Sequence, residues 1–451
     1  MIELLRRASL RDASHPAIVD DHRTTSYGEL AAAAESAAAY LADQGVRRFG
    51  VLDYDAATVV SLLAAASLVG AEACLYPPIE DPEALAEQAA RFDHQLVFTH
   101  HEDVVGRVPC VDPAELFATP AKEAADPPES RPLLVLTTGT TGTPRGIRHD
   151  WSRLLRATDR IEPAPDQHWL FCYGPHQFGG LQILIHVMAA GATLVAPAPR
   201  RPREGLAAMG AHRVTHVSAT PTYWRFLLAE MRSAGNPVPD LQQVTLGGEA
   251  VPGPLLGELA SSFPNANISQ VYAASEFGSS GSVRDARDGL PLSILDRGDD
   301  ADIVMKIVDD ELWVRSRVGM LGYYGEEADD PDEWRPTGDL VDIEGDRILF
   351  RGRSSDIINV GGVKVHPLPV ENLISEVPGV KMARVYGRPN AMTGAIVAVE
   401  VVADDGVDTD ELDTAIRDAC ADLVSASRPR SIRFVDEIAT TGDKIVRRMN
   451  A

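Results

Sequence analysis

The sequence predicts an α/β protein with a large N-terminal domain of parallel-rich sheets flanked by helices, a small β-barrel-like part, and a small C-terminal α+β domain. Before residue 303, short β-branched runs alternate with Ala- and Leu-rich stretches, which is typical of βα units. From residue 303 the sequence pattern changes and predicts hairpins that turn at acidic residues or Gly. A compact αβ module follows residue 356. We therefore expect domains at 1–354 and 355–451.

Each element is expected from its local composition. Ala- and Leu-rich stretches predict helices near residues 29–44, 57–69, 83–92, 204–212, 222–234 and 254–262. β-branched runs predict strands near 72–76, 133–137, 192–196, 214–218, 243–246 and 268–271. Hairpins are expected over 303–316 and 339–352. The C-terminal module should contain strands near 382–386 and 396–401 and a helix near 410–424. The Pro- and acid-rich stretch 119–131 is expected to be an exposed loop.

Composition restricts the classes of partner. The chain has 451 residues, of which 66 are acidic and 42 are Lys or Arg, giving a net charge of −24. Its 45 % hydrophobic content is enough for a sizeable core. A negative surface repels phosphate backbones and anionic lipid, so we expect neither nucleic-acid nor membrane binding. A local basic site for a small phosphorylated ligand is compatible with this charge.

Cysteine use and apolar runs predict a soluble, cytoplasmic protein. The chain has four scattered cysteines and no CxxC pair, which fits a reducing compartment: Cys74, Cys110, Cys172 and Cys420. The start of the chain, MIELLRRASLRD, has no apolar stretch, so no secretory signal is expected. Residues 56–71 are too short for a membrane span of roughly 20 residues. Residues 178–199 are interrupted by Gln182, His186 and Gly191 and are expected to be a helix followed by a strand.

The most informative segment is LVLTTGTTGTPRG, residues 134–146. An apolar strand leads into six residues that are all Thr or Gly: Thr137, Thr138, Gly139, Thr140, Thr141 and Gly142. Gly lets the backbone fold tightly around an anion, and Thr hydroxyls and backbone N–H groups donate to phosphate oxygens. Arg145 adds a positive charge. The segment lacks the GxxxxGK[ST] pattern of a Walker A loop. The alternative is a Thr/Gly-rich surface turn.

This loop and a series of further motifs resemble those of the adenylate-forming superfamily, which includes acyl-CoA synthetases, luciferases and peptide-synthetase adenylation domains. The motifs occur in the family's order along nearly the whole chain: TSYGEL (25–30), LLAAASLVGAEACLYPP (62–78), YGPHQFGG (173–180), QVYAASEFG (270–278), ELWVRSRVGMLGYYG (311–325), TGD (337–339), GRSSDIINVGGVKVHPLPVE (352–371) and TTGDKIVRR (440–448). The chain is most similar to a small acyl- or aryl-CoA ligase. It departs at Pro144-Arg145-Gly146, where the family normally has Pro-Lys-Gly.

The resemblance implies a nucleotide site. The Thr/Gly loop and Arg145 would hold the ATP phosphates, and Glu276 would hold Mg²⁺. Tyr272 would lie against adenine, with Ala273 beside it, and Phe350 would cover the ring. Asp339 would accept both ribose hydroxyls, and Arg353 would reach the same sugar. Ser275 keeps a hydroxyl where the family more often has Thr. Without the motifs, Glu276 and Arg353 would be solvated charges and TGD a plain turn.

The resemblance also implies a pocket for the acid. His176 matches a ring that lines the pocket and shifts between half-reactions; the alternative is an ordinary partly buried histidine. Its expected neighbours are Gln177, Phe178 and Gly180, and the other walls come from SATPTYW (218–224) with Thr220, from Gly247 and Gly248, and from Ala274. No Asp occupies segment 173–180, so the usual anchor for an α-ammonium is missing. An α-amino acid substrate is therefore disfavoured.

The small domain is expected to move. Ser355 occupies the family's hinge position, where Asp or Lys is usual. Gly361 and Gly362 would let a pantetheine thiol approach closely. Lys444 is similar to the lysine that bridges the carboxylate and the α-phosphate, although Asp443 intervenes in the common Gly-Lys pair. The alternative for Lys444 is a solvated residue on a mobile tail.

These implications give a leading function and three alternatives. We expect ATP-dependent adenylation of a small aryl or aliphatic carboxylic acid with release of pyrophosphate, followed by transfer to a thiol, with coenzyme A as the default acceptor. The alternatives are loading of a carrier-protein phosphopantetheine, activation of a non-carboxylate oxyanion such as nitrite, and a nucleotide-binding regulator without catalysis. The cofactors would be ATP, Mg²⁺ and CoA, and the protein a monomer or homodimer.

Overall fold

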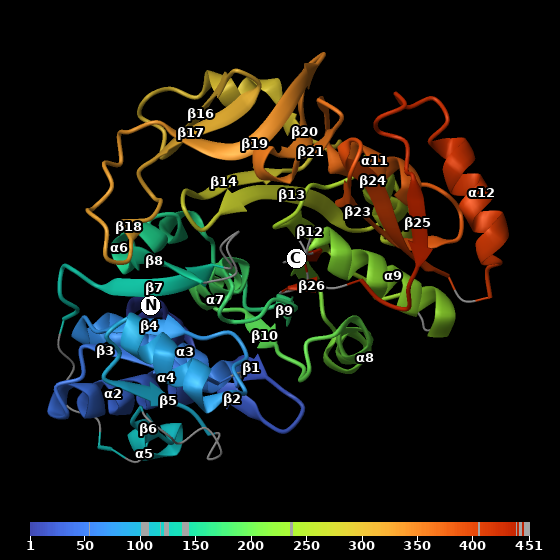
Figure 1. Ribbon diagram of the computed structural model, residues 1–451. Helices are drawn as coiled ribbons and strands as arrows, with labels where there is room; N and C mark the ends of the chain where they lie inside the picture. The colour runs from blue at the N-terminus through green and yellow to red at the C-terminus, as the bar shows by residue number, and fades with distance from the viewer. Residues whose placement is uncertain are drawn as a thin grey trace.

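The computed structural model describes residues 1–53, 55–100, 108–117, 119–120, 126–137, 144–234, 238–404, 406–438, 440–441 and 444–445. Figure 1 shows the N-terminal elements (blue to teal) at the lower left, olive and orange strands across the top, and the C-terminal elements (red) at the right. Among the described helices, none is long and apolar enough to cross a bilayer. All four cysteines lie in described parts of the chain and are in the thiol form.

The first sheet has seven strands in the order β18-β8-β7-β4-β3-β5-β6. Its strands are β3 (Arg48–Val51), β4 (Glu72–Leu75), β5 (Leu96–Phe98), β6 (Cys110–Val111), β7 (Pro132–Thr137), β8 (Arg145–Asp150) and β18 (Gly322–Tyr323). Pairing is parallel from β7 to β6, whereas β8 is antiparallel to both β7 and β18. The associated helices are α2 (Tyr27–Asp43), α3 (Ala56–Val69), α4 (Pro82–Arg91) and α5 (Pro113–Phe117).

The second sheet has eight strands in the order β14-β13-β12-β11-β9-β10-β1-β2. They are β1 (Pro16–Val19), β2 (Thr24–Ser26), β9 (His168–Phe171), β10 (Thr193–Val195), β11 (His216–Ala219), β12 (Gln243–Gly247), β13 (Asn267–Ala274) and β14 (Gly278–Val283). The six central strands are parallel, and only the two edge strands are antiparallel. Its helices are α1 (Ile2–Arg11), α6 (Trp151–Leu154), α7 (Phe178–Ala190), α8 (Pro202–His212), α9 (Pro221–Ala234) and α10 (Gly253–Ser262), with the 3-10 turn η2 (Thr158–Arg160).

Helix α3 shows why the longest apolar run of the first 100 residues is a core element. Every residue from Ala56 to Leu68 is buried, as expected for a helix that is apolar on all sides. Asp55 caps its N-terminus by accepting from the backbone N–H of Thr58, and Gly70 ends it in the left-handed conformation. The largest hydrophobic cluster of the protein packs α3 with α1, α2, α7 and strands of both sheets. The two sheets therefore share one core.

A five-stranded antiparallel sheet follows, in the order β15-β20-β19-β17-β16. It comprises β15 (Leu290–Pro291), β16 (Ile303–Val308), β17 (Glu311–Ser316), β19 (Arg335–Glu344) and β20 (Arg347–Arg353), with the turn η3 (Leu292–Asp296). Both predicted hairpins are confirmed. Their turns need left-handed backbone, with φ of 50° at Asp309, 61° at Asp310 and 59° at Gly345. The part expected to be barrel-like is this sheet, with β15 and β16 at its edges.

The C-terminal domain has its own sheet and core. Its elements are the turn η4 (Ser354–Asp356), β21 (Ile358–Val360), β22 (Val363–Val365), α11 (Pro367–Ser375), β23 (Val380–Asn390), β24 (Gly394–Ala403), α12 (Thr409–Ala419) and β25 (Ser431–Phe434), with the short pair β26 (Thr440–Thr441) and β27 (Lys444–Ile445). β24 lies between β23 and β25, and α12 packs on the same core. The expected boundary at 354/355 falls within η4. The helix expected to reach residue 424 ends at Ala419.

Candidate active site

One large cavity, of about 1420 Å³, lies where the sheets and the C-terminal domain meet. Its walls come from the ends of β7, β8, β12, β13 and β20, from α7, and from α11 of the C-terminal domain. The structure brings 14 of the expected site residues to this cavity: Thr137, Arg145, His176, Phe178, Gly247, Gly248, Tyr272, Ala273, Ala274, Ser275, Glu276, Asp339, Phe350 and Arg353. Residues that are distant in sequence therefore share one site.

A buried carboxylate marks one end of the cavity, which we call the nucleotide end. Asp339 on β19 pairs across the ladder with Arg353 on β20, and the Arg353 Nε lies 3.1 Å from the Asp339 Oδ1. The Tyr272 hydroxyl donates to the other carboxylate oxygen over 2.7 Å. Burial raises the pKa of Asp339, and its carboxylate in turn raises the pKa of Arg353. Each Asp339 oxygen has a second lone pair, so the carboxylate can still accept two hydroxyl groups.

The aromatic residues of the nucleotide end form a single wall. The rings of Tyr272 and Phe350 are stacked with their centroids 5.1 Å apart, and Phe277 packs on Tyr272 at 5.3 Å. No base fits between two rings at this separation. A purine would therefore lie against the wall made by Tyr272 and Phe350, rather than between the two rings.

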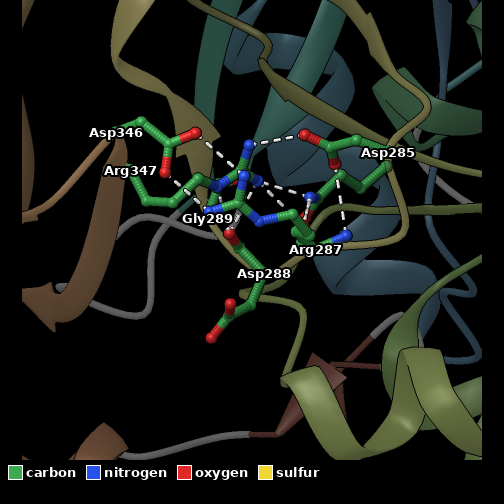
Figure 2. A network of polar contacts seen from close by, with 7 residues as sticks. Asp285, Arg287, Asp288, Gly289, Asp346 and Arg347 are labelled. Carbon is green, nitrogen blue, oxygen red and sulfur yellow. Dashed lines mark hydrogen bonds and ion pairs between the residues drawn. The ribbon is translucent and has the colours of Figure 1, made fainter.

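A buried arginine that the sequence did not single out holds the neighbouring loop in place (Figure 2). Arg347, at the start of β20, is only 4 % exposed. Its guanidinium donates to the backbone carbonyls of Arg287, Asp288 and Gly289 and pairs with Asp285 at 2.6 Å. A side chain with five donors in a fixed plane suits such a set of carbonyls.

This loop contributes directly to the cavity. Arg284, Gly289 and Leu290 line it, and the Gln270 side chain, which also lines it, donates to the Gly289 carbonyl over 2.9 Å. Gly289 has a φ of 68°, and a Cβ there would overlap the Ile348 carbonyl oxygen, so no other residue fits. Arg347 is thus a positioning residue for one wall of the nucleotide end.

The phosphate loop connects two adjacent antiparallel strands. β7 ends at Thr137, which pairs with Arg145 at the start of β8. The loop residues Thr138, Gly139, Thr140, Thr141 and Gly142 lie outside the described residues. The Arg145 guanidinium lies 3.4 Å from the centroid of the Tyr323 ring and forms an ion pair with Glu326 at 2.9 Å. A planar guanidinium stacks on an aromatic face in a way that an ammonium does not, which accounts for Arg at this position.

Glu276 lies in the tight turn between β13 and β14, with Ser275 beside it. The backbone of this turn is fixed, because the Glu276 carbonyl accepts from Met320 N over 3.0 Å and a Cβ on Gly319 would press against the same carbonyl. Within the described part of the chain, no group of three or more His, Cys, Asp or Glu side chains is arranged to hold a metal. A single carboxylate facing the cavity suits Mg²⁺, which is commonly held by one or two carboxylates together with substrate phosphates.

His176 lies at the start of the acid side of the cavity. Its ring folds back over Gly174, where any Cβ would collide with the imidazole. Burial, together with the positive charge of Arg200, lowers the pKa of His176 to about 4, so the ring is neutral at pH 7. Its Nδ1 is buried and has no hydrogen-bond partner among the residues that the structure describes. Phe178 stacks on the fully buried His149 at 5.3 Å, a second histidine that the motifs did not identify.

Four of the expected residues do not line the cavity. A Cβ on Gly180 would overlap the Gly174 carbonyl, so Gly180 allows α7 to pack against the 174–177 loop. The Thr220 hydroxyl accepts from Tyr223 N over 3.0 Å and caps α9 instead of forming a wall. Gly361 and Gly362, with φ of 60° and 88°, form the turn between β21 and β22 on the C-terminal domain. Neither glycine lines the cavity.

Lys444 is described only through its backbone. It forms β27, whose partner in β26 is Thr441. The expected role of its side chain stays a prediction. The C-terminal domain instead contributes residues of α11 and β23 to the cavity wall, among them Leu368, Glu371 and Met382.

The carboxylate–guanidinium pair beside an aromatic wall and the Glu276 carboxylate at the cavity are the features expected of an adenylate-forming enzyme. The chain belongs to the AMP-binding enzyme family: the family profile matches residues 5–324, and that of the AMP-binding enzyme C-terminal domain matches residues 369–444.

Similar proteins cover most of the chain. A Mycobacterium tuberculosis 3-[(3aS,4S,7aS)-7a-methyl-1,5-dioxo-octahydro-1H-inden-4-yl]propanoyl:CoA ligase is 29 % identical over 71 % of this chain and 66 % of its own length. A 2-succinylbenzoate–CoA ligase of Bacillus cereus is 24 % identical over 98 % of this chain and 95 % of its own. The crystal structure of the anthranilate CoA ligase AuaEII with anthranoyl-AMP superposes with a TM-score of 0.85 at 20 % identity, over 98 % and 95 % of the two chains. The structural match confirms the predicted fold class.

Proposed function

We propose that the protein is an AMP-forming acid–thiol ligase that activates a small organic carboxylic acid with ATP and transfers the acyl group to coenzyme A. The observation that carries this proposal is that one cavity is continuous from Asp339 and Arg353, past Glu276, to the polar strand residues Ser218, Gln243 and Thr245. A nucleotide and an acid can then meet at Glu276. The names of the relatives as CoA ligases support the thiol step.

In the first half-reaction, a carboxylate oxygen of the acid attacks the α-phosphorus of ATP, and pyrophosphate leaves with the electrons of the broken P–O bond. Asp339 and Arg353 orient the ribose, and the wall of Tyr272 and Phe350 orients the base. Glu276 would hold Mg²⁺, which when bound offsets the charge of the phosphates. Holding both reactants in one cavity removes much of the entropic barrier of a bimolecular step.

In the second half-reaction, the thiol sulfur attacks the acyl carbonyl carbon, AMP leaves with the electrons of the acyl–oxygen bond, and the thiol proton is released. We place the hinge for this step at Ser355 and the approach of the thiol at Gly361 and Gly362. Lys444 is the cation that bridges the carboxylate and the α-phosphate in the first half-reaction. The exposed position of this hairpin on the C-terminal domain supports a role that begins when that domain turns.

The test is ATP–pyrophosphate exchange against a panel of aryl, short aliphatic and fatty acids, with nitrite included, followed by addition of CoA or a phosphopantetheinylated carrier protein. We expect exchange that depends on a carboxylic acid and then release of an acyl-CoA. Exchange with nitrite alone, or an acyl group accepted only by the carrier protein, would replace the proposed substrate or acceptor. ATP binding without exchange under any condition would remove the enzymatic function.

A further inference from the structure

The cavity continues well beyond the nucleotide end, along one face of the eight-stranded sheet. The rows of this face follow from the strand register: Gly247 pairs with Val271, Thr245 with Ser269, and Gln243 with His216. Gly247 and Gln243 both line the cavity, and four residues of strand at about 3.3 Å each separate them, roughly 13 Å in all. We call this stretch the acid channel.

The channel floor is polar, although the strands that form it are parallel and central. Trp169, His216 and Gln243 form one row, and Ser218, Thr245 and Ser269 form the next. The opposite face of the same strands is a buried apolar cluster that includes Leu170, Val217, Val244 and Leu246. Central parallel strands are normally apolar on both faces. The polarity is therefore confined to the side that faces the cavity.

Part of this floor is already satisfied internally. The Gln243 Nε2 donates to the hydroxyls of Thr245 and Ser269 over 3.0 and 2.9 Å, and these two hydroxyls are 3.0 Å apart. These hydrogen bonds hold the side chains of Gln243, Thr245 and Ser269 in fixed orientations. It leaves the histidines as the groups best placed to contact a ligand.

Two imidazoles flank the Trp169 ring. His186 on α7 lies with its centroid 4.7 Å from the Trp169 ring, and His216 on β11 lies at 4.8 Å. The Nδ1 of His216 is engaged by the Thr215 hydroxyl at 2.8 Å. Within the described part of the chain, neither ring nitrogen of His186 has a protein hydrogen-bond partner, and the ring borders the cavity.

Both rings are uncharged at pH 7, because burial lowers the pKa of each to about 4. A neutral imidazole offers one N–H donor and one acceptor nitrogen. The described residues that line the cavity include charged side chains around this stretch: Arg160 at the exposed rim, and Arg225, Glu249 and Arg284. The two rings themselves thus offer hydrogen bonds but no charge.

We propose, building on the ligase function above, that the acid is elongated and carries an uncharged hydroxyl or carbonyl group roughly 10 Å from its carboxylate, where His186 and His216 hydrogen-bond to it. A plain hydrocarbon tail would leave these buried polar groups without partners, which is costly. A second carboxylate at the same place would be buried against two neutral rings, which costs more.

The test compares matched acids that differ only at the far end. One set is 4-hydroxycinnamate, 4-methylcinnamate and 4-carboxycinnamate; the other is a fused bicyclic propanoate with and without a ring ketone. In the better-accepted set, kcat/KM for the uncharged polar acid should exceed that for the apolar one by at least about tenfold, and the dicarboxylate should be poorest. Equal values, or a preference for the apolar acid or the dicarboxylate, would overturn the proposal.

Variants assign the preference to the rings. His186→Phe and His216→Phe keep a flat ring but remove the nitrogens, so each should bring the polar-to-apolar ratio close to one by raising KM for the polar acid. KM for ATP should not change. The exposed His22 lies away from the cavity, and His22→Phe is the matched control, which should keep the wild-type ratio. A wild-type ratio in folded His186→Phe and His216→Phe would also overturn the proposal.

A binding measurement separates this inference from the ligase function. Titration calorimetry of the same acids without ATP needs no chemistry. Preferential binding of the polar acid without any pyrophosphate exchange would support the channel and reject the ligase function. Exchange with every acid of the set, without a polar preference in either experiment, would support the ligase function and reject the proposed role of the channel.

Discussion

The two ends of the cavity are built on opposite electrostatic principles. The nucleotide end is held by charge: Asp339 pairs with Arg353, and Arg347 pairs with Asp285 and gathers three backbone carbonyls. The central groups of the acid channel are two neutral rings, His186 and His216. The relatives named above are ligases of different acids, so we expect the acid channel to determine the acid specificity of this chain.

The largest expected effect falls on the step that joins the two ends. Lys444→Ala should slow adenylate formation by roughly a hundredfold or more, because a cation between carboxylate and α-phosphate offsets their repulsion. Thioester formation from a chemically supplied adenylate should fall far less, since that repulsion is then gone. Single-turnover kinetics of each half-reaction measures both. Equal losses would indicate that Lys444 serves folding or domain docking.

The next effect tests the carboxylate at the junction of the two ends. Glu276→Gln keeps the shape of the side chain but removes the charge that balances Mg²⁺. Magnesium-dependent pyrophosphate exchange should fall roughly 10- to 100-fold, while the melting temperature stays near that of the wild type. A normal exchange rate in the folded variant would remove Glu276 from the site.

A smaller effect should be confined to the nucleotide end. Arg347→Leu leaves the carbonyls of the 287–289 loop without their donor, so KM for ATP should rise about tenfold, equivalent to about 1.4 kcal/mol. KM for the acid should be unchanged, and Arg347→Lys should recover part of the loss. Arg287→Ala is the matched control, because among the described residues its side chain pairs with the exposed Asp346 alone (Figure 2). Equal changes in both KM values would show that Arg347 supports the fold alone.

The smallest expected effect is the pH dependence of stability that the buried histidines cause, and it vanishes at neutral pH. Burial lowers the pKa of His149, His176, His186 and His216 to about 4, so the folded state binds fewer protons than the unfolded state between pH 4 and about 6.5. Their contribution to stability is therefore complete above pH 6.5 and is lost as the pH falls toward 4. Urea unfolding at several pH values should show this slope, and it should be shallower in His186→Phe. An identical slope in that variant would indicate that His186 titrates normally.

Sequence patterns predicted the fold well where the pattern is local. The βα alternation, the hairpins at Asp309–Asp310 and Gly345, and the helix near residues 57–69 are confirmed. Helix α1 was not predicted. The helix expected to reach residue 424 stops at Ala419, and its C-cap Cys420, which still donates its backbone N–H to the Ile416 carbonyl, packs in the core of the small domain.

The site was predictable only where the residues occur in contiguous motifs. Tyr272, Glu276, Asp339 and Arg353 were named from motifs, and the structure brings them to one cavity. Thr220 and Gly180 belong to similar motifs but have structural roles, which spacing cannot distinguish from contact with a ligand.

Arg347, His186 and His216 were missed because the contacts that matter are made across strands and between a helix and a sheet. One local signal was present. Polar residues alternate with apolar ones at His216 and Ser218, and again at Gln243 and Thr245, inside strands that should be wholly apolar. Such an alternation in a central strand indicates a polar cavity.

The most direct test of a reaction that spans both ends of the cavity is a single turnover with ATP, Mg²⁺ and a 4-hydroxycinnamate or keto-acid substrate, without CoA, analysed by mass spectrometry. We predict an acyl adenylate in stoichiometric amount together with pyrophosphate, and conversion of that adenylate to an acyl-CoA once CoA is added. Formation of ADP and phosphate, or ATP turnover that does not depend on the acid, would contradict it.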